Sequence, residues 1–125
     1  MGRDLAVGVD LVEVDRFARA LRRWPRLIER VFTDTELDAC LDSPNLDERL
    51  AARFAAKEAT FKALGDGWPN VAYHDVQIDT TDGQPVLVLQ GRAAELAGTR
   101  AVACSLSHER GLALAEVILH ATEEG

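Results

Sequence analysis

Apolar residues recur along this chain with two periods, and the change between them separates predicted strands from predicted helices. Residues 5–14 form an apolar run rich in β-branched side chains, which predicts a buried strand. Residues 47–64 repeat apolar side chains at steps of three and four, which predicts a long helix that ends at Gly65. The segment Thr33–Glu36 has the form of a capping box and predicts a short helix ending near Leu41.

The second half of the chain changes to the alternating pattern of strands. Four strands are predicted in two pairs, 76–80 with 86–89 and 101–107 with 112–119. The first pair is joined through Asp82-Gly83, a strong hairpin signal, and the second through residues 108–111. With a short helix over 93–97, these elements predict one α+β domain over residues 1–125. In it, a mainly antiparallel sheet packs against the long helix and shorter helices.

The composition gives the chain a net negative charge, which limits the classes of partner that it can bind. The chain has 125 residues, 47% of them hydrophobic and 28% charged, and its net charge of −7 argues against general affinity for nucleic acid or anionic membrane. No apolar run approaches the roughly 18 residues that a membrane-spanning helix needs, and the N-terminus lacks a secretory pattern. We therefore expect a cytoplasmic protein in which Cys40 and Cys104 are small buried hydrophobes.

Two carboxylates occupy positions where the pattern is apolar. Asp10 interrupts the first strand on the same face as Gly8. Glu58 lies four residues after Phe54 and three before Phe61, so it projects into the apolar side of the long helix. A half-buried carboxylate is costly unless a positive charge meets it. Because Mg²⁺ typically takes one or two protein carboxylates, with water and phosphate oxygens completing its shell, the pair predicts a magnesium site.

Basic residues accompany Glu58 along the long helix. Lys57 and Lys62 bracket it, while Arg53 and Arg49 precede Lys57 at steps of one turn. One interpretation is a helix made soluble by basic side chains. The other is a phosphate cradle around a metal, in which cations stabilise charge on a leaving phosphate. The residues alone thus indicate a Mg²⁺-dependent phosphate-transfer site and leave its substrate open.

A second basic segment precedes this helix. Six arginines fall within fifteen residues: Arg16, Arg19, Arg22, Arg23, Arg26 and Arg30. Most would share a face if the segment were one helix, although Pro25 is expected to interrupt it. The run is either a solvated basic face or a docking surface for an acidic macromolecule.

Four segments, in this order and spacing, resemble the motifs of the holo-acyl-carrier-protein synthases, the small-subunit group of the 4′-phosphopantetheinyl transferases. They are GVDLVEV at 8–14, RFAAKEA at 53–59, KALG at 62–65 and SLSH at 105–108. The resemblance covers nearly the whole chain. It implies transfer of 4′-phosphopantetheine from coenzyme A to a serine of apo-acyl carrier protein, with release of 3′,5′-ADP, in fatty-acid or polyketide biosynthesis.

The resemblance also implies roles for single residues. Asp10 and Glu58 would bind a Mg²⁺ ion that grips the coenzyme A pyrophosphate, and Lys62 would help 3′,5′-ADP to leave. The nucleotide and its phosphates would be contacted by Arg49, Arg53, Gly65 and His108. Either Glu58 or a water held on the metal would take the proton from the carrier serine. The segment Tyr73-His74-Asp75 stands where the family often has a tryptophan before the acid.

The arginine run gains a partner from the same resemblance, because acyl carrier proteins are acidic. The implied docking residues are Arg16, Arg19, Arg23 and Leu27. Members of the group assemble as homotrimers with each coenzyme A site between two subunits. Two other functions remain open, a non-catalytic carrier-binding adaptor and a different Mg²⁺-dependent phosphate enzyme.

Overall fold

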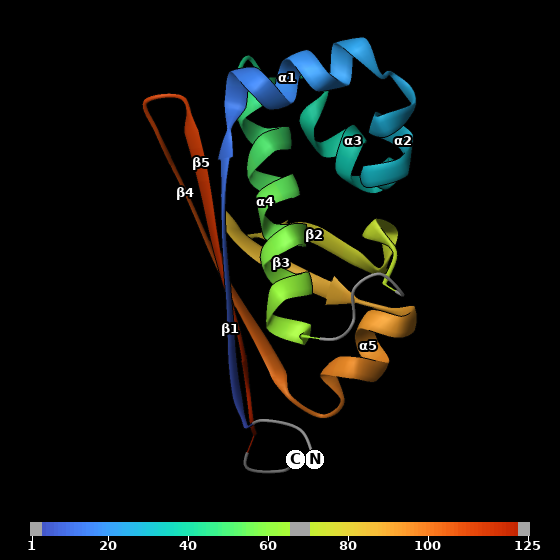
Figure 1. Ribbon diagram of the computed structural model, residues 1–125, viewed down its shortest axis with the longest axis vertical. Coiled ribbons are helices and arrows are strands. Elements are labelled where there is room, and N and C mark those ends of the chain that lie inside the picture. The colour runs from blue at the N-terminus through green and yellow to red at the C-terminus, as the bar shows by residue number, and fades with distance from the viewer. Residues whose placement is uncertain (1–3, 66–70, 123–125) are drawn as a thin grey trace.

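The fold is organised around one long helix, α4 (Leu46–Leu64), which lies against a three-stranded antiparallel sheet (Figure 1). The computed structural model describes residues 4–65 and 71–122. In spatial order, the strands of the sheet are β1 (Leu5–Glu13), β5 (Leu112–His120) and β4 (Ala101–Glu109). None of the helices in the described residues is long and apolar enough to cross a membrane.

Small side chains bring α4 and the sheet into close contact. The buried face of α4 is rich in alanine, and β5 turns Ala113 and Ala115 toward it. On β1, Gly8 lies so near the helix that a Cβ atom there would stand 1.8 Å from the carbonyl oxygen of Ala59. This approach places Asp10, two residues later on the same strand face, beside α4.

Strand β1 is buried on one face only, which corrects the prediction of a buried strand. Its alternate residues Leu5, Val7, Val9 and Leu11 are 44–61% exposed. The neighbouring strand adds Leu112 and Leu114 to the same outer face. An apolar run with side chains of both faces hydrophobic cannot be told from a fully buried strand by its pattern.

Three short helices gather at one end of α4 (Figure 1). They are α1 (Val14–Arg23), α2 (Arg26–Val31) and α3 (Asp34–Cys40). Pro25 precedes α2 and interrupts the basic segment as predicted. The predicted capping box is present, since the Thr33 amide donates to Glu36 Oε1 at 2.9 Å and the Glu36 amide donates to Thr33 Oγ1 at 3.2 Å. Cys40 is wholly buried in this cluster, as predicted.

The remaining elements form a separate layer beside α4. They are the 3₁₀ turn η1 (Tyr73–Asp75), the strands β2 (Val76–Thr81) and β3 (Gln84–Leu89), and the helix α5 (Gly91–Ala97). The predicted Asp82-Gly83 turn joins β2 to β3 with φ of 51° and 79°. Within the described residues, β2 and β3 pair only with each other, so the strands form two sheets rather than one.

The second hairpin is tighter than predicted. Strand β4 continues to Glu109, and only Arg110 and Gly111, with φ of 52° and 79°, make the turn. His108 therefore lies in a strand and not in a loop. The sequence after Gly65 also predicts a loop over residues 66–70, and that after His120 a frayed tail over 121–125; residues 66–70 and 123–125 lie outside the described residues.

Candidate functional site

Asp10 and Glu58 face one cavity, although they come from different elements. Asp10 reaches it from β1 and Glu58 from the middle of α4, and the cavity measures about 540 Å³. Its wall also contains Arg16 and Phe17 of α1. Both acids are half-buried. The structure thus brings together the two carboxylates that the sequence singled out.

Lys62 adds a cation beside Asp10. Its Nζ lies 3.0 Å from Asp10 Oδ1 and donates to the carbonyl of Val9 at 2.9 Å. The Lys62 side chain is 55% exposed, so solvent screens this ion pair and its contribution to stability is small. An exposed ammonium group beside Asp10 is well suited to meet an incoming anion.

Glu58 is compensated by a phenol, a partner that the sequence did not reveal. The Tyr73 hydroxyl donates to Glu58 Oε1 at 2.9 Å. The Tyr73 ring packs against Phe54 and Phe61, with centroids 5.9 and 5.2 Å away. Burial and the neighbouring Glu58 carboxylate raise the pKa of Tyr73, which keeps the phenol protonated as a donor.

Lys57 takes no part in this cavity, which corrects its assignment to either a solvated face or a phosphate cradle. It is wholly buried, and its Nζ lies 2.9 Å from Oε1 of the equally buried Glu36. The same ammonium donates to the carbonyls of Tyr73, at 3.0 Å, and Val76. Burial lowers the pKa of Lys57, while the Glu36 carboxylate raises it. The pair therefore joins α3, α4 and η1 inside the protein.

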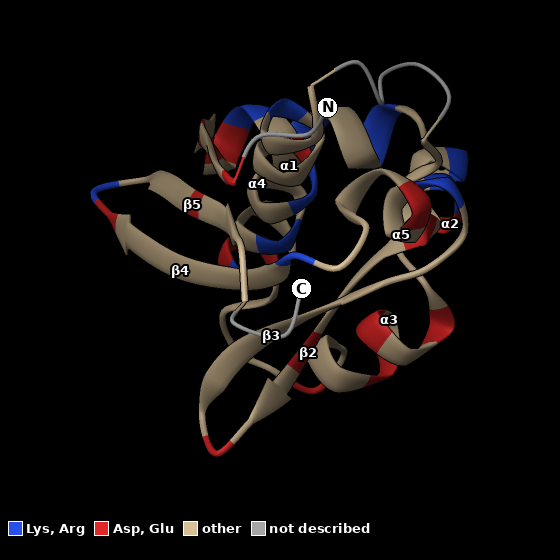
Figure 2. Ribbon diagram, turned by 90° about the horizontal axis from the view of Figure 1, so that it is seen from below, with Lys and Arg blue, Asp and Glu red and all other residues tan. Residues whose placement is uncertain are grey.

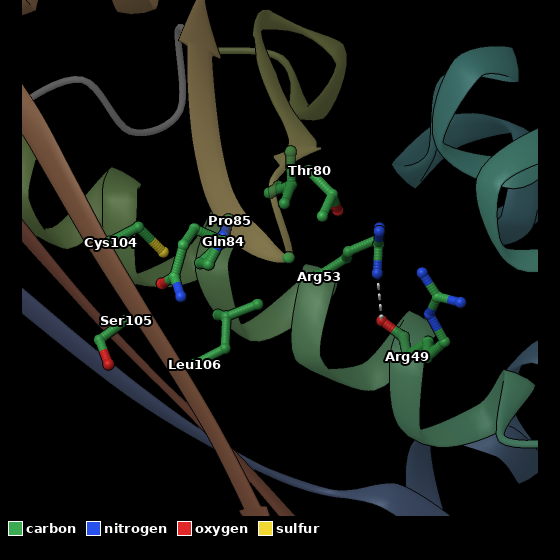
Figure 3. A pocket seen from close by; sticks show the side chains of 10 residues that line it. Arg49, Arg53, Thr80, Gln84, Pro85, Cys104, Ser105 and Leu106 are labelled. Carbon is green, nitrogen blue, oxygen red and sulfur yellow. Dashed lines mark hydrogen bonds between the residues drawn. The ribbon is translucent and has the colours of Figure 1, made fainter.

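Arg49 and Arg53 line a second cavity, of about 550 Å³ (Figure 3). Arg53 is only 5% exposed, and its Nη1 donates weakly to the Arg49 carbonyl at 3.5 Å. Within the described residues, Arg53 Nε is buried without a hydrogen-bond partner. Because a buried guanidinium donor without an acceptor is costly, this cavity suits an anionic ligand.

The opposite wall of the second cavity comes from β4 and the β2–β3 hairpin (Figure 3). Cys104 lies there and is only half-buried, which corrects its prediction as a buried hydrophobe. Burial still raises the pKa of its thiol to about 11. The two cavities have no lining residue in common.

The other predicted nucleotide contacts lie apart from these cavities. His108, on β4, places Nδ1 2.8 Å from Glu48 Oε2 and is largely exposed. This contact brings it to the residue before Arg49 on α4. Gly65 ends α4 with φ of 74°, as predicted for a C-cap glycine. Neither His108 nor Gly65 lines either cavity.

Comparisons with known proteins show which family this chain is similar to. The model of the 4′-phosphopantetheinyl transferase superfamily matches residues 6–123. The chain is 40% identical over 127 residues to the holo-[acyl-carrier-protein] synthase of Moorella thermoacetica, covering 97% of this chain and 99% of that one. The corresponding values for the synthase of Salinispora arenicola are 45% over 118 residues, 91% and 96%. The chain belongs to the 4′-phosphopantetheinyl transferase superfamily.

The likeness extends to the fold of the transferase. The ACPS–CoA complex of Chronobacterium ammoniagenes superposes with a TM-score of 0.84 at 30% identity, covering 97% of this chain and 100% of that one. The resemblance and the α+β fold predicted from the motifs are therefore both confirmed.

The basic residues of the transferase gather on α1, α2 and α4, whereas α3 is acidic (Figure 2). Arg16, Arg19 and Arg23 of α1 are all exposed. Leu27 is half-buried in a groove of about 550 Å³ at the start of α2. Beside it Trp24, 58% exposed, carries the Arg23 guanidinium 5.4 Å from its ring centroid. The sequence pattern did not single out this tryptophan.

Proposed function

We propose that this transferase moves 4′-phosphopantetheine from coenzyme A to a serine of apo-acyl carrier protein, giving holo-acyl carrier protein and 3′,5′-ADP. The supporting observation is that Asp10 and Glu58 line one cavity, with Lys62 bound to Asp10, in a chain whose family match spans residues 6–123. Relatives that match over nearly their whole length carry the name holo-[acyl-carrier-protein] synthase. The same match supports a single transferase domain over the whole chain.

The residues at the cavity fit Mg²⁺. Asp10 and Glu58 offer hard carboxylate oxygens, which Mg²⁺ prefers. Within residues 4–65 and 71–122, no three His, Cys, Asp or Glu side chains cluster as a metal cage would require. Two carboxylates leave room for water and substrate phosphate, as is typical of Mg²⁺ sites. When bound, Mg²⁺ would supply positive charge for the pyrophosphate of coenzyme A.

The side chains around the cavity divide the remaining chemistry. Lys62 would neutralise charge that develops on the pyrophosphate as 3′,5′-ADP departs. Glu58, through the oxygen that Tyr73 does not engage, or a nearby water would take the proton of the attacking serine. The reaction otherwise needs positioning of the two substrates.

The arginine cavity is our proposed site for the nucleotide phosphates. Its support is the buried Arg53 guanidinium with an Nε lacking an acceptor in the described residues, beside Arg49. His108 contacts Glu48, the residue before Arg49 on α4, and would add a further contact to the nucleotide phosphates. Gly65 would contribute backbone contact at the end of α4.

We also propose that the protein is a homotrimer. The outer face of the three-stranded sheet exposes apolar side chains over two neighbouring strands, namely Leu5, Val7, Val9, Leu11, Leu112 and Leu114. Contiguous apolar surface of this kind is typical of a protein interface. Separate cavities for the metal and for the nucleotide support a coenzyme A site completed between two subunits.

The carrier protein would dock on α1 and α2. Arg16 lines the cavity of Asp10 and Glu58, so a partner bound to this basic surface would bring its serine to the site. Arg19, Arg23 and Leu27 would extend the contact to acidic and apolar side chains of the carrier. The net charge of −7 argues against nucleic acid as an alternative partner.

The test is intact-protein mass spectrometry of an apo-acyl carrier protein incubated with this protein and coenzyme A, with Mg²⁺ or with EDTA. We expect a Mg²⁺-dependent mass gain of one phosphopantetheine, and none with Glu58→Gln. Transfer that persists in EDTA or in Glu58→Gln would contradict the metal assignment. No transfer to either fatty-acid or polyketide carriers would favour an adaptor or another phosphate enzyme.

A further inference from the structure

The hydrogen bond between Tyr73 and Glu58 joins the metal cavity to a part of the protein outside it. We propose that Tyr73 is a positioning residue, whose hydroxyl fixes one carboxylate oxygen of Glu58 and leaves the other facing Mg²⁺ and the acceptor serine. This inference rests on the proposed function, because it assigns Glu58 to the metal. Among the described residues, Tyr73 is not part of the lining of either cavity.

The first support is the contact itself. The hydroxyl donates to Glu58 Oε1 at 2.9 Å, within the ordinary range for an O–H···O hydrogen bond. Its ring is held between Phe54 and Phe61, so the hydroxyl cannot swing away without losing both aromatic contacts. The phenol hydroxyl is the donor and the carboxylate oxygen the acceptor in this contact.

The second support is that the backbone of Tyr73 is anchored from inside the protein. The Lys57 ammonium donates to the Tyr73 carbonyl at 3.0 Å and is itself paired with Glu36. Lys57 and Glu36 are both fully buried. Glu36 Oε2 also accepts the amide of Ile78 at 2.8 Å. A buried ion pair with its other hydrogen bonds satisfied has one geometry, so it fixes the place of η1 relative to α4.

The third support is that the rest of η1 is tied down as well. The His74 ring donates from Nε2 to the carbonyl of Glu29, on α2, at 2.6 Å. The His74 carbonyl accepts from the side-chain amide of Gln90 at 3.0 Å. Asp75 Oδ2 accepts the amide of Ala72 at 3.1 Å. Every residue of the turn therefore has a partner, which is what a preorganised support for a metal ligand requires.

The fourth support is that the partner of Glu58 is Tyr73, while Lys62 is paired with Asp10. Glu58 and Lys62 are separated by four residues on α4, the spacing at which Glu and Lys usually pair on a helix. Here Lys62 binds Asp10 instead, at 3.0 Å, while Glu58 accepts from Tyr73. The phenol thus holds Glu58 without adding a positive charge that would compete with Mg²⁺.

The main test compares Tyr73→Phe, which keeps the ring, with the wild type. Binding of Mn²⁺, as a probe for Mg²⁺, is measured by electron paramagnetic resonance. We expect Tyr73→Phe to weaken Mn²⁺ binding roughly 10- to 100-fold, as loss of partners to metal ligands does. We expect kcat to fall while the KM for the carrier protein stays constant. Thr60→Val is the matched control, since it removes another buried hydroxyl of the same region, which within residues 4–65 and 71–122 bonds only the Ala56 carbonyl.

A double-mutant cycle with Glu58→Gln shows whether Tyr73 acts through Glu58. Tyr73→Phe is expected to change Mn²⁺ binding in the wild-type background and not in Glu58→Gln. Unchanged affinity and kcat in Tyr73→Phe, or equal losses in both backgrounds, would overturn the proposal. Wild-type protein that binds Mn²⁺ through Glu58 but does not modify a carrier would refute the proposed function and leave this inference intact.

A spectroscopic readout avoids any dependence on the stability of the variant. Tyr73 is the only tyrosine of the chain, so 3-fluorotyrosine labels this position alone. We expect its ¹⁹F resonance to shift when Mg²⁺ is added to the folded protein, and to stay in place in Glu58→Gln. A ¹⁹F resonance that does not shift when Mg²⁺ is added to the wild-type sequence, under conditions where Mn²⁺ binds, would contradict the proposal.

Discussion

At the scale of single residues, the surroundings of an ammonium group decide what it can do. Lys57 is wholly buried, and its ammonium group donates to Glu36 and to two backbone carbonyls. Lys62, five residues later, is 55% exposed and can change partners at little cost. The first lysine therefore maintains the structure, and the second is available to a substrate.

The ion pair of Lys57 and Glu36 gives a residue-scale prediction. Glu36→Gln leaves a buried ammonium group without its counter-charge, and we expect the free energy of unfolding to fall by about 3–5 kcal/mol. Urea denaturation measures this loss. The control is Lys62→Met, whose exposed pair should change stability by less than about 1 kcal/mol. Equal effects of the two variants would show that burial does not govern the difference.

The sequence predicts part of the candidate site because Asp10 and Glu58 interrupt an apolar pattern. Such an interruption can be seen in one sequence. It does not separate Lys57 from Lys62, since both flank Glu58 and the partner of Lys57 is twenty-one residues upstream in α3. The role of Tyr73 is not predicted for the same reason, because Tyr73 and Glu58 are fifteen residues apart in the sequence. Side chains whose role depends on a distant partner need the tertiary structure.

At the scale of elements, the close contact of β1 with α4 sets the position of Asp10. The alanine-rich helix face and the small residues of the sheet leave no space between the two backbones at Gly8. Since Asp10 lies two residues beyond Gly8, a shift of the strand would move it away from α4 and from Glu58.

Gly8→Ala tests this contact. The added Cβ would meet backbone atoms of Ala59 and Ala63, which cannot turn aside as a side chain can. We expect a loss of about 3 kcal/mol or more in the free energy of unfolding, with weaker Mn²⁺ binding in the remaining folded protein. Gly98→Ala is the control, because its left-handed φ of 65° is strained but its surroundings are open, and it should cost about 1 kcal/mol. A Gly8 variant as stable as this control would contradict the prediction.

Elements with local signals are predicted well, and their associations are not. The capping box of Thr33 and the Asp82-Gly83 turn form as predicted because their contacts lie within four residues. The separation of the hairpins into two sheets depends on which strand pairs with β1, and no local pattern carries that information. Periodicity likewise does not distinguish the exposed outer face of β1 from its buried face, because both faces of the strand are apolar.

At the scale of the whole molecule, none of the described elements covers the outer face of the three-stranded sheet. α4 covers the inner face, and the outer face carries apolar side chains on β1 and β5. A second copy of the chain, placed against this face, would bury them and bring a second set of cavities near the first. Assembly would then be a condition of catalysis.

Val7→Lys tests the trimer without touching either cavity. Val7 is 52% exposed on the outer face, opposite Ile118, and a charge there should prevent burial of the face. We expect the sedimentation mass to fall from that of a trimer to that of a monomer, with a parallel loss of transfer activity. Val88→Lys, at a 42% exposed position of β3, is the matched control and should change neither. A monomeric wild type would contradict the assembly.

If the outer sheet face forms the proposed homotrimer, the activity of this protein depends on its abundance. If only the trimer holds its two-subunit sites together, turnover at low concentration rises with the third power of the amount of chain, not in proportion to it. Small changes in synthesis or dilution at cell division would then act as a threshold on carrier activation, with no effector required.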